Sequence, residues 1–328
     1  MADVNRRAAL GGLLGAMPAA FAGAAWSQPP LPPTDSRLAP IDESEGEVVT
    51  ALDAWTDTYG RPTASVMLNG QGPFAFMVDT GSNATVMAER VALALGAQPT
   101  GTLTVAGATG TAIKPYTTLD TVQTGAVTRK NLRVAILSDS GLARGDGILG
   151  ADVFAGKRLV FNIREKIVRV EPSKRGTRVA PSGNIRIRNG LLAEVDGRVG
   201  NIPAKLMLDT GADYCIANPA LGEALRREHP RLKRVPNVRV VGVTGHRIVG
   251  EFVSLPRVDL RAFSVSDSGA VIADASIFKL WDLQSVPAMI VGVDLLSRLE
   301  SFSIDYGARM FDAQLAEAMI ARNPAAFG

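Results

Sequence analysis

The sequence predicts an all-β protein built from two similar halves. Short apolar runs rich in β-branched residues recur along the chain, separated by Gly, Pro and Asn, as expected for short strands joined by turns. The chain lacks a regular alternation of strands with long helices, which excludes a parallel α/β sheet. Four sequence blocks also recur in the same order, which indicates an internal duplication.

The repeated blocks show how the two halves correspond. The first copies are Ala75–Gly81, Val105–Gly110, Gly147–Phe154 and Leu159–Ile163. The second copies are Lys205–Gly211, Val241–Gly245, Met289–Leu296 and Phe302–Tyr306, at offsets that grow from 130 to 143 residues. We therefore expect a first half over residues 60–176 and a second half over residues 177–328.

Helices are expected to be few and short. Met87–Leu95 stops before Gly96, a residue type common just after a helix end, and Ala220–Arg227 has the equivalent place in the second half. Short helical turns are expected after Gly150 and Gly292. A last helix is expected over Ala313–Arg322.

The N-terminal segment has the layout of an export signal. Arg6 and Arg7 precede a mildly apolar Gly/Ala-rich run that ends in small residues, which predicts a twin-arginine-type signal peptide over residues 1–27. Residues 28–59 are proline-rich at their start and read as a linker or a short pro-segment. No later segment is long and apolar enough to span a membrane, so we expect a periplasmic or secreted protein.

Composition excludes several classes of protein. A net charge of +3 with scattered Lys and Arg gives no sign of a nucleic-acid-binding face. The single cysteine, Cys215, rules out an intrachain disulfide and is expected to be buried behind a functional loop. Two histidines and no Cys/His cluster predict neither a metal site nor a cofactor.

Two of the repeated blocks end in the same tripeptide, Asp-Thr-Gly. An apolar strand leads into Asp79 in the first half and into Asp209 in the second. The strand carries the carboxylate into the interior, the glycine permits a sharp turn, and the threonine can hydrogen-bond across a two-fold axis. Two carboxylates brought together share one proton, so one can act as a general base on water while the other acts as an acid.

These motifs resemble the pepsin/retropepsin-like aspartic proteases. The resemblance covers residues 60–315 and includes the apolar-apolar-Gly blocks Ile148–Gly150 and Ile290–Gly292. It implies a bilobal acid-protease fold of two pseudo-symmetric, retropepsin-like β-barrel halves. It also implies an aspartic endopeptidase whose substrate is a peptide or protein. Because one chain already carries both aspartates, we expect a monomer.

The resemblance also implies roles for the neighbouring residues. Those expected to support the dyad loops are Thr80, Gly81, Ser82, Thr210, Gly211 and Ala212. Those expected to contact substrate are Asn83, Asp213, Gly107, Ala108, Thr109, Gly110, Val243, Thr244 and Gly245, the last seven from two flap-like hairpins. Asn83 departs from the family pattern, whereas Asp213 fits it.

The two dyad loops differ at one position. Ser82 follows the first Asp-Thr-Gly and Ala212 follows the second. A hydrogen bond from the Ser82 hydroxyl would lower the pKa of Asp79, so we expect Asp79 to ionise first and Asp209 to hold the proton. A catalytically inactive homologue that binds peptides in the same cleft is the alternative reading.

Overall fold

The structure is a computed structural model that describes residues 50–52, 54–57, 60–142, 145–174, 183–261 and 263–315. These residues belong to one compact unit, residues 38–328. The predicted signal peptide, residues 1–27, lies outside the described residues. Among the described residues, no helix is long and apolar enough to cross a membrane.

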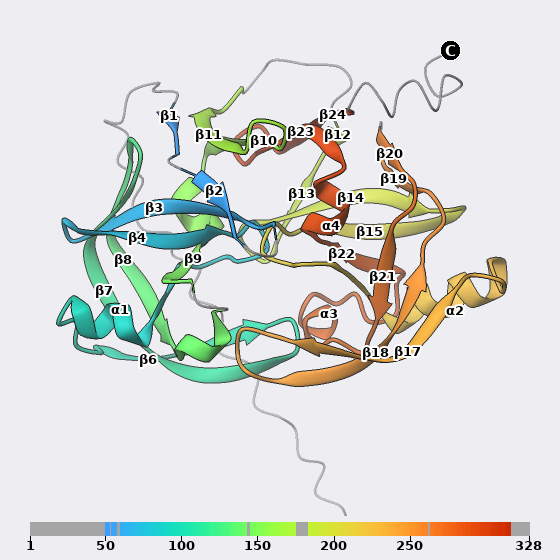
Figure 1. Cartoon of the computed structure of the whole chain (residues 1–328), viewed down its shortest axis with the longest axis horizontal. Coiled ribbons are helices and arrows are strands. Elements are labelled where there is room, and N and C mark those ends of the chain that lie inside the picture. Colours follow the sequence, from blue (N-terminus) through green and yellow to red (C-terminus); the bar gives the residue numbers. More distant parts are fainter. Residues whose placement is uncertain are drawn as a thin grey trace, which may run out of the picture. The chain divides into compact units, whose positions relative to one another are not determined.

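An eight-stranded sheet holds most of the described strands of the first half (Figure 1). In sheet order these are β2 (Ala54–Thr56), β3 (Pro62–Leu68), β4 (Gln71–Val78), β9 (Gly147–Leu149), β5 (Val86–Ala88), β8 (Val127–Leu137), β7 (Gly110–Thr124) and β6 (Gly101–Gly107). The helical segments described in this half are α1 (Glu89–Ala94) and the 3-10 turns η1 (Asp139–Gly141) and η2 (Ala151–Phe154).

The second half repeats this plan. Its sheet order is β17 (Arg234–Val241), β18 (Arg247–Ser254), β21 (Gly269–Ile272), β16 (Cys215–Ala217), β22 (Ala288–Val291), β15 (Ile202–Leu208), β14 (Leu192–Val199), β19 (Val258–Leu260) and β20 (Phe263–Val265), and β13 (Arg186–Arg188) pairs with β14. The helices described here are α2 (Pro219–Glu228), α3 (Ser276–Leu280) and α4 (Val293–Leu296). The predicted all-β duplication is therefore confirmed.

A third sheet joins the two halves. Its order is β1 (Thr50–Ala51), β11 (Ile167–Pro172), β10 (Lys157–Asn162), β23 (Leu299–Asp305), β24 (Met310–Leu315) and β12 (Gly183–Asn184). Three strands come from each half, and β10 pairs with β23 at the centre, where the rings of Phe161 and Phe302 stack with centroids 4.6 Å apart. Strands β1 and β2 lie within residues 28–59, the segment expected to be a linker or a short pro-segment.

The predicted helices are partly corrected. α2 and the turns η2 and α4 are where we expected them, and the Asn218 side chain caps α2 by accepting a 2.9 Å hydrogen bond from Leu221 N. In contrast, Met87 and Ala88 belong to strand β5, because Val86 and Met87 pair with buried strand β9. Residues 313–315 belong to β24 rather than to a last helix, and residues 316–322 lie outside the described residues.

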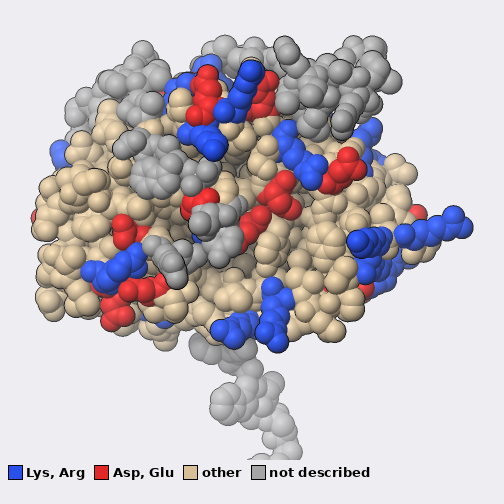
Figure 2. Space-filling model, viewed as in Figure 1, with Lys and Arg blue, Asp and Glu red and all other residues tan. Residues whose placement is uncertain are grey.

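Charged side chains are mixed over most of the face drawn in Figure 2, while basic ones gather over α2 and β17–β18, at the right. Four exposed basic residues, Arg226, Arg227, Arg231 and Lys233, lie at the end of α2 and just after it. This stretch is locally basic in a chain whose Lys and Arg are otherwise scattered along the sequence.

Candidate active site

Each Asp-Thr-Gly loop starts at the end of a buried strand. Val78, the last residue of β4, is fully buried, and Leu208, the last residue of β15, is 1% exposed. The strand of the apolar-apolar-Gly block runs parallel beside each of them, β9 along β4 and β22 along β15. The amides of Asp79 and Asp209 each donate a 3.0 Å hydrogen bond to this neighbour, at Leu149 O and Val291 O. Both aspartates are therefore held by main-chain hydrogen bonds to a buried neighbouring strand.

The two threonines join the loops across the pseudo-two-fold axis. Thr80 Oγ1 donates to Leu208 O at 2.9 Å, and Thr210 Oγ1 donates to Val78 O at 2.7 Å. Each hydroxyl also accepts a 3.1 Å hydrogen bond from the amide of the other threonine. Both side chains are 1% exposed, so the hydroxyls are satisfied inside the protein. The predicted hydrogen bonds of the threonines across the axis are confirmed.

The two glycines allow the carboxylates to approach each other. A side chain at Gly81 would collide with the Asp209 carboxylate, and one at Gly211 would collide with the Asp79 carboxylate. Each glycine amide also donates a 2.8 Å hydrogen bond to Oδ1 of the aspartate in its own loop. The loops therefore place one carboxylate against the main chain of the other loop, an arrangement that only a residue without Cβ permits.

Burial and mutual repulsion shift the acidity of the pair. Burial, together with the neighbouring Asp209 carboxylate, raises the pKa of Asp79 well above the usual carboxyl range. Burial also raises the pKa of Asp209, but hydrogen bonds from Asp79 and from the amides of Gly211 and Ala212 oppose that rise. The Ala212 amide lies 3.1 Å from Asp209 Oδ1. The second amide favours the charged form of Asp209, which makes Asp79 the favoured holder of the shared proton.

This assignment reverses the one expected from Ser82. The Ser82 hydroxyl donates to Ala84 O at 2.8 Å, not to Asp79. Its amide is directed to the main-chain oxygen of Asp79, at 3.4 Å, rather than to the carboxylate. Asp79 thus has one loop amide on its side chain where Asp209 has two. The difference lies in the main-chain path of the loops, which the residue types at 82 and 212 do not reveal.

Asn83 and Asp213, each four residues after a dyad aspartate, form polar contacts with the opposite half. The Asn83 amide group donates to Asn189 O, and Asn83 Oδ1 accepts a 3.1 Å hydrogen bond from Leu191 N. Asp213 forms a 3.2 Å ion pair with Arg61, whose guanidinium also pairs with Asp57. The substrate contacts expected of Asn83 and Asp213 stay predictions, and both side chains already have partners within the chain.

The two hairpins predicted as flaps touch at their tips. We call β6–β7, with its tip at residues 107–110, the first flap, and β17–β18, with its tip at residues 242–246, the second flap. Thr109 Oγ1 donates to His246 O at 2.9 Å, and Thr244 Oγ1 donates to Gly110 O at 3.3 Å. The tips also rest on the opposite half, where Ile277 N donates to Ala108 O at 3.4 Å and Gly141 lies against Val243 O.

Two acidic residues behind the loops, Asp152 and Asp294, were not identified from the sequence. Asp152 accepts hydrogen bonds from the amide and hydroxyl of Thr85, at 2.9 and 2.8 Å. The equivalent pair in the second half is Asp294 and Cys215, whose Sγ lies 3.3 Å from the carboxylate. Cys215 is fully buried, as predicted. The signal was present, because Asp152 and Asp294 follow the repeated glycines 150 and 292 at the same spacing.

No group of three or more His, Cys, Asp or Glu that could hold a metal ion occurs among the described residues. Arg61 lowers the pKa of both dyad carboxylates, and its side chain is 12% exposed. Sequence analysis missed Arg61, because it lies outside the repeated blocks.

Comparison with known families agrees with this geometry. An aspartyl protease family model matches the chain over residues 64–153 and again over residues 195–295, one segment in each half. The two segments together cover more than half of the 328 residues, so the chain belongs to the aspartyl protease family. No curated protein matched the chain.

Proposed function

We propose that the chain is an aspartic endopeptidase in which Asp79 and Asp209 form the catalytic dyad. The observation that carries this proposal is the packing of each buried carboxylate against the glycine of the opposite loop. Such a pair holds one proton at mildly acidic pH, because two like charges this close cannot both ionise. Membership of the aspartyl protease family supports a peptide as the substrate.

The asymmetry of the pair suggests the role of each group. Asp209, stabilised as an anion by two loop amides, would accept a proton from a water molecule placed between the carboxylates. Asp79, which holds the shared proton, would donate it to the carbonyl oxygen of the scissile peptide bond. The water oxygen adds to the carbonyl carbon and gives a gem-diol. The C–N bond then breaks, the departing amine takes the proton from Asp209, and a gem-diol hydroxyl returns a proton to Asp79. No metal or cofactor is needed to balance these steps.

Substitution of the dyad tests this function. Asp79→Asn and Asp209→Asn should each reduce cleavage of an unfolded protein substrate to background, because either change removes one half of the proton-sharing pair. Asp139→Asn, an exposed carboxylate paired with Arg90, is the matched control and should retain full activity. Substantial turnover by either dyad variant would overturn the assignment, and peptide binding by an inactive wild-type chain would favour the binding-protein alternative.

We also propose export by the twin-arginine route to the periplasm or the exterior. The support is the Arg6-Arg7 pair and the small apolar run that follows it. Replacement of both arginines by lysine should leave the chain in the cytoplasmic fraction of an expressing bacterium. Unchanged export of that variant would contradict this route.

A further inference from the structure

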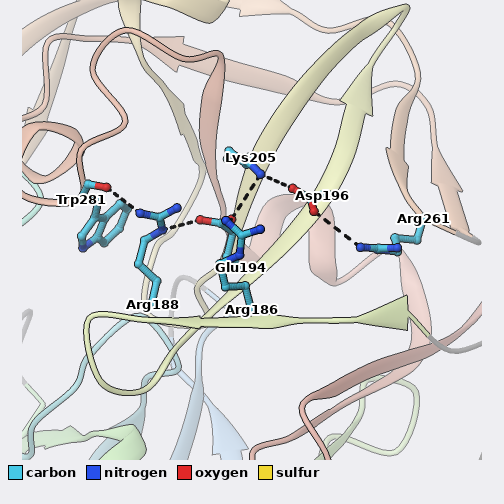
Figure 3. A network of polar contacts seen from close by, with 7 residues as sticks. All are labelled: Arg186, Arg188, Glu194, Asp196, Lys205, Arg261 and Trp281. Carbon is cyan, nitrogen blue, oxygen red and sulfur yellow. Dashed lines mark hydrogen bonds and ion pairs between the residues drawn. The ribbon is translucent and has the colours of Figure 1, made fainter.

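The second half holds a cluster of charged side chains around one buried carboxylate, Glu194 (Figure 3). Glu194 on β14 is 1% exposed, and Arg188 Nε donates a hydrogen bond to its Oε2. Lys205 Nζ and Arg186 Nη1 lie 3.6 and 3.8 Å from Oε1, an oxygen without a hydrogen-bond partner among the described residues. Removing the Glu194 carboxylate from water is costly, so its ion pairs are a poor source of stability.

The first half folds without this cluster. Glu194 lies opposite Met207, and the equivalent residue of the first half, opposite Met77, is Thr63. Lys205 corresponds to Ala75, so neither position carries a charged side chain in the first half. The fold of a half therefore does not require charged side chains at the positions of Glu194 and Lys205. Their presence in the second half points to a role that is specific to that half.

Arg188 reaches from this cluster to the support of the first flap. Its Nη1 donates a 2.8 Å hydrogen bond to the main-chain oxygen of Trp281, directly after α3. The Trp281 amide bonds to Ile277 O at 3.0 Å, and the amide of Ile277 in turn donates to Ala108 O at the flap tip. Arg188 thus holds the short helix on which the tip of the first flap rests.

Arg188 is also adjacent to the loop that Asn83 clasps. Asn189 and Leu191, which follow it in the chain, are the two residues whose main chain bonds to the Asn83 side chain. Asn83 belongs to the loop that begins at Asp79. One guanidinium, fixed by a buried carboxylate, therefore lies between the support of the flap and the support of the first dyad loop.

We propose that Arg188, held in place by Glu194, is a positioning residue that sets the place of the first flap relative to the Asp79 loop. The proposal rests on the proposed peptidase function for its consequence, since a flap has its effect on a bound substrate. When Arg188 is lost, α3 and the loop at residues 189–191 are no longer linked. The flap tip then spends more time away from its support, and substrate binding weakens more than the chemical step.

Hydrogen exchange of the unliganded full-length chain tests the positioning directly. Arg188→Met and Glu194→Gln should both speed exchange at residues 105–111. Arg188→Lys keeps the charge but loses the fork geometry of the guanidinium, so its exchange should lie between those of the wild type and Arg188→Met. Asp196→Asn is the matched control, because Asp196 pairs with the same Lys205 but its side chain is 50% exposed, and it should leave the flap unchanged. If Arg188→Met is poorly folded, Arg188→Met/Glu194→Leu removes both charges together and should show the same faster exchange.

Peptide kinetics provide the second readout. KM should rise by about two- to thirtyfold in Arg188→Met, the range expected for residues that couple two sites, with kcat nearly unchanged. Unchanged exchange at residues 105–111, or a loss confined to kcat, would overturn the proposal. If the wild-type chain cleaves no peptide, the proposed peptidase function is contradicted. The positioning role of Arg188 is still tested, because the exchange experiment needs no activity.

Discussion

At the residue scale, Ser82 shows how a plausible hydrogen bond can be misassigned. Its hydroxyl is bonded to Ala84 O and does not reach the dyad. Ser82→Ala should therefore leave the acid limb of the kcat/KM pH profile in place, within about 0.3 pH unit, because no hydrogen bond to a carboxylate is lost. A move of that limb to higher pH by about one unit would show that the hydroxyl reaches Asp79 during the reaction.

Asp152 should make the stability of the protein depend on pH. Burial raises its pKa from 3.8 to about 6 in the folded state. Between these values the folded protein keeps a proton that the unfolded chain has lost, so stability falls as the pH rises, by about 3 kcal/mol in total. Asp152→Asn should remove this part of the slope. The measurement is urea unfolding at pH 4 and pH 7.

The control for that experiment is Asp139→Asn, which removes an exposed carboxylate. It should keep the wild-type slope between pH 4 and pH 7. An Asp152→Asn variant with the same slope as wild type would contradict the buried-acid interpretation. The dyad contributes in the same direction in all three proteins, so the comparison isolates Asp152.

At the element scale, the flaps were predictable but their contacts were not. The glycine-rich tips marked two hairpins, and the structure adds that Thr109 and Thr244 hydrogen-bond across to the opposite tip. Thr109→Val should speed hydrogen exchange in both hairpins, at residues 105–113 and 241–248. Thr111→Val, an exposed neighbour on the same flap, is the control and should have no effect.

Occupation of the site should have the opposite effect on the same segments. A transition-state mimic of peptide hydrolysis, aimed at the dyad, should slow exchange in both flaps of the wild-type chain, because lids of this kind close on their ligand. Unchanged exchange in both hairpins while the mimic binds would argue against a flap role.

At the scale of the whole molecule, the third sheet joins the two halves of one chain. Strands β10 and β23, one from each half, pair over residues 158–162 and 301–305, and both dyad aspartates come from the same chain. We expect activity per mole of chain to stay constant on dilution, with light scattering giving the mass of a monomer. Activity that falls steeply on dilution, together with a transition from dimer to monomer, would contradict this expectation.

The sequence alone determined the plan of the protein. Repeated blocks and alternating apolar runs predicted two β-rich halves, and the doubled Asp-Thr-Gly motif identified Asp79 and Asp209 as partners. These features are local, since a strand pattern, a turn glycine and a repeat can each be read within a few residues. Where tertiary pairing overrides local preference, as at Met87 in strand β5 and Ala313 in β24, the sequence misled.

Only the tertiary structure decided which carboxylate holds the proton and what surrounds the pair. The second amide on Asp209, the ion pair of Arg61 with Asp213 and the link from Arg188 to Trp281 all join residues far apart in the chain or depend on the path of a loop. The energies of these three interactions depend on distance and burial, and neither quantity can be read from a periodicity or a motif. The catalytic candidates can therefore be identified from local sequence, whereas the electrostatic difference between them depends on the main-chain path of the folded loops.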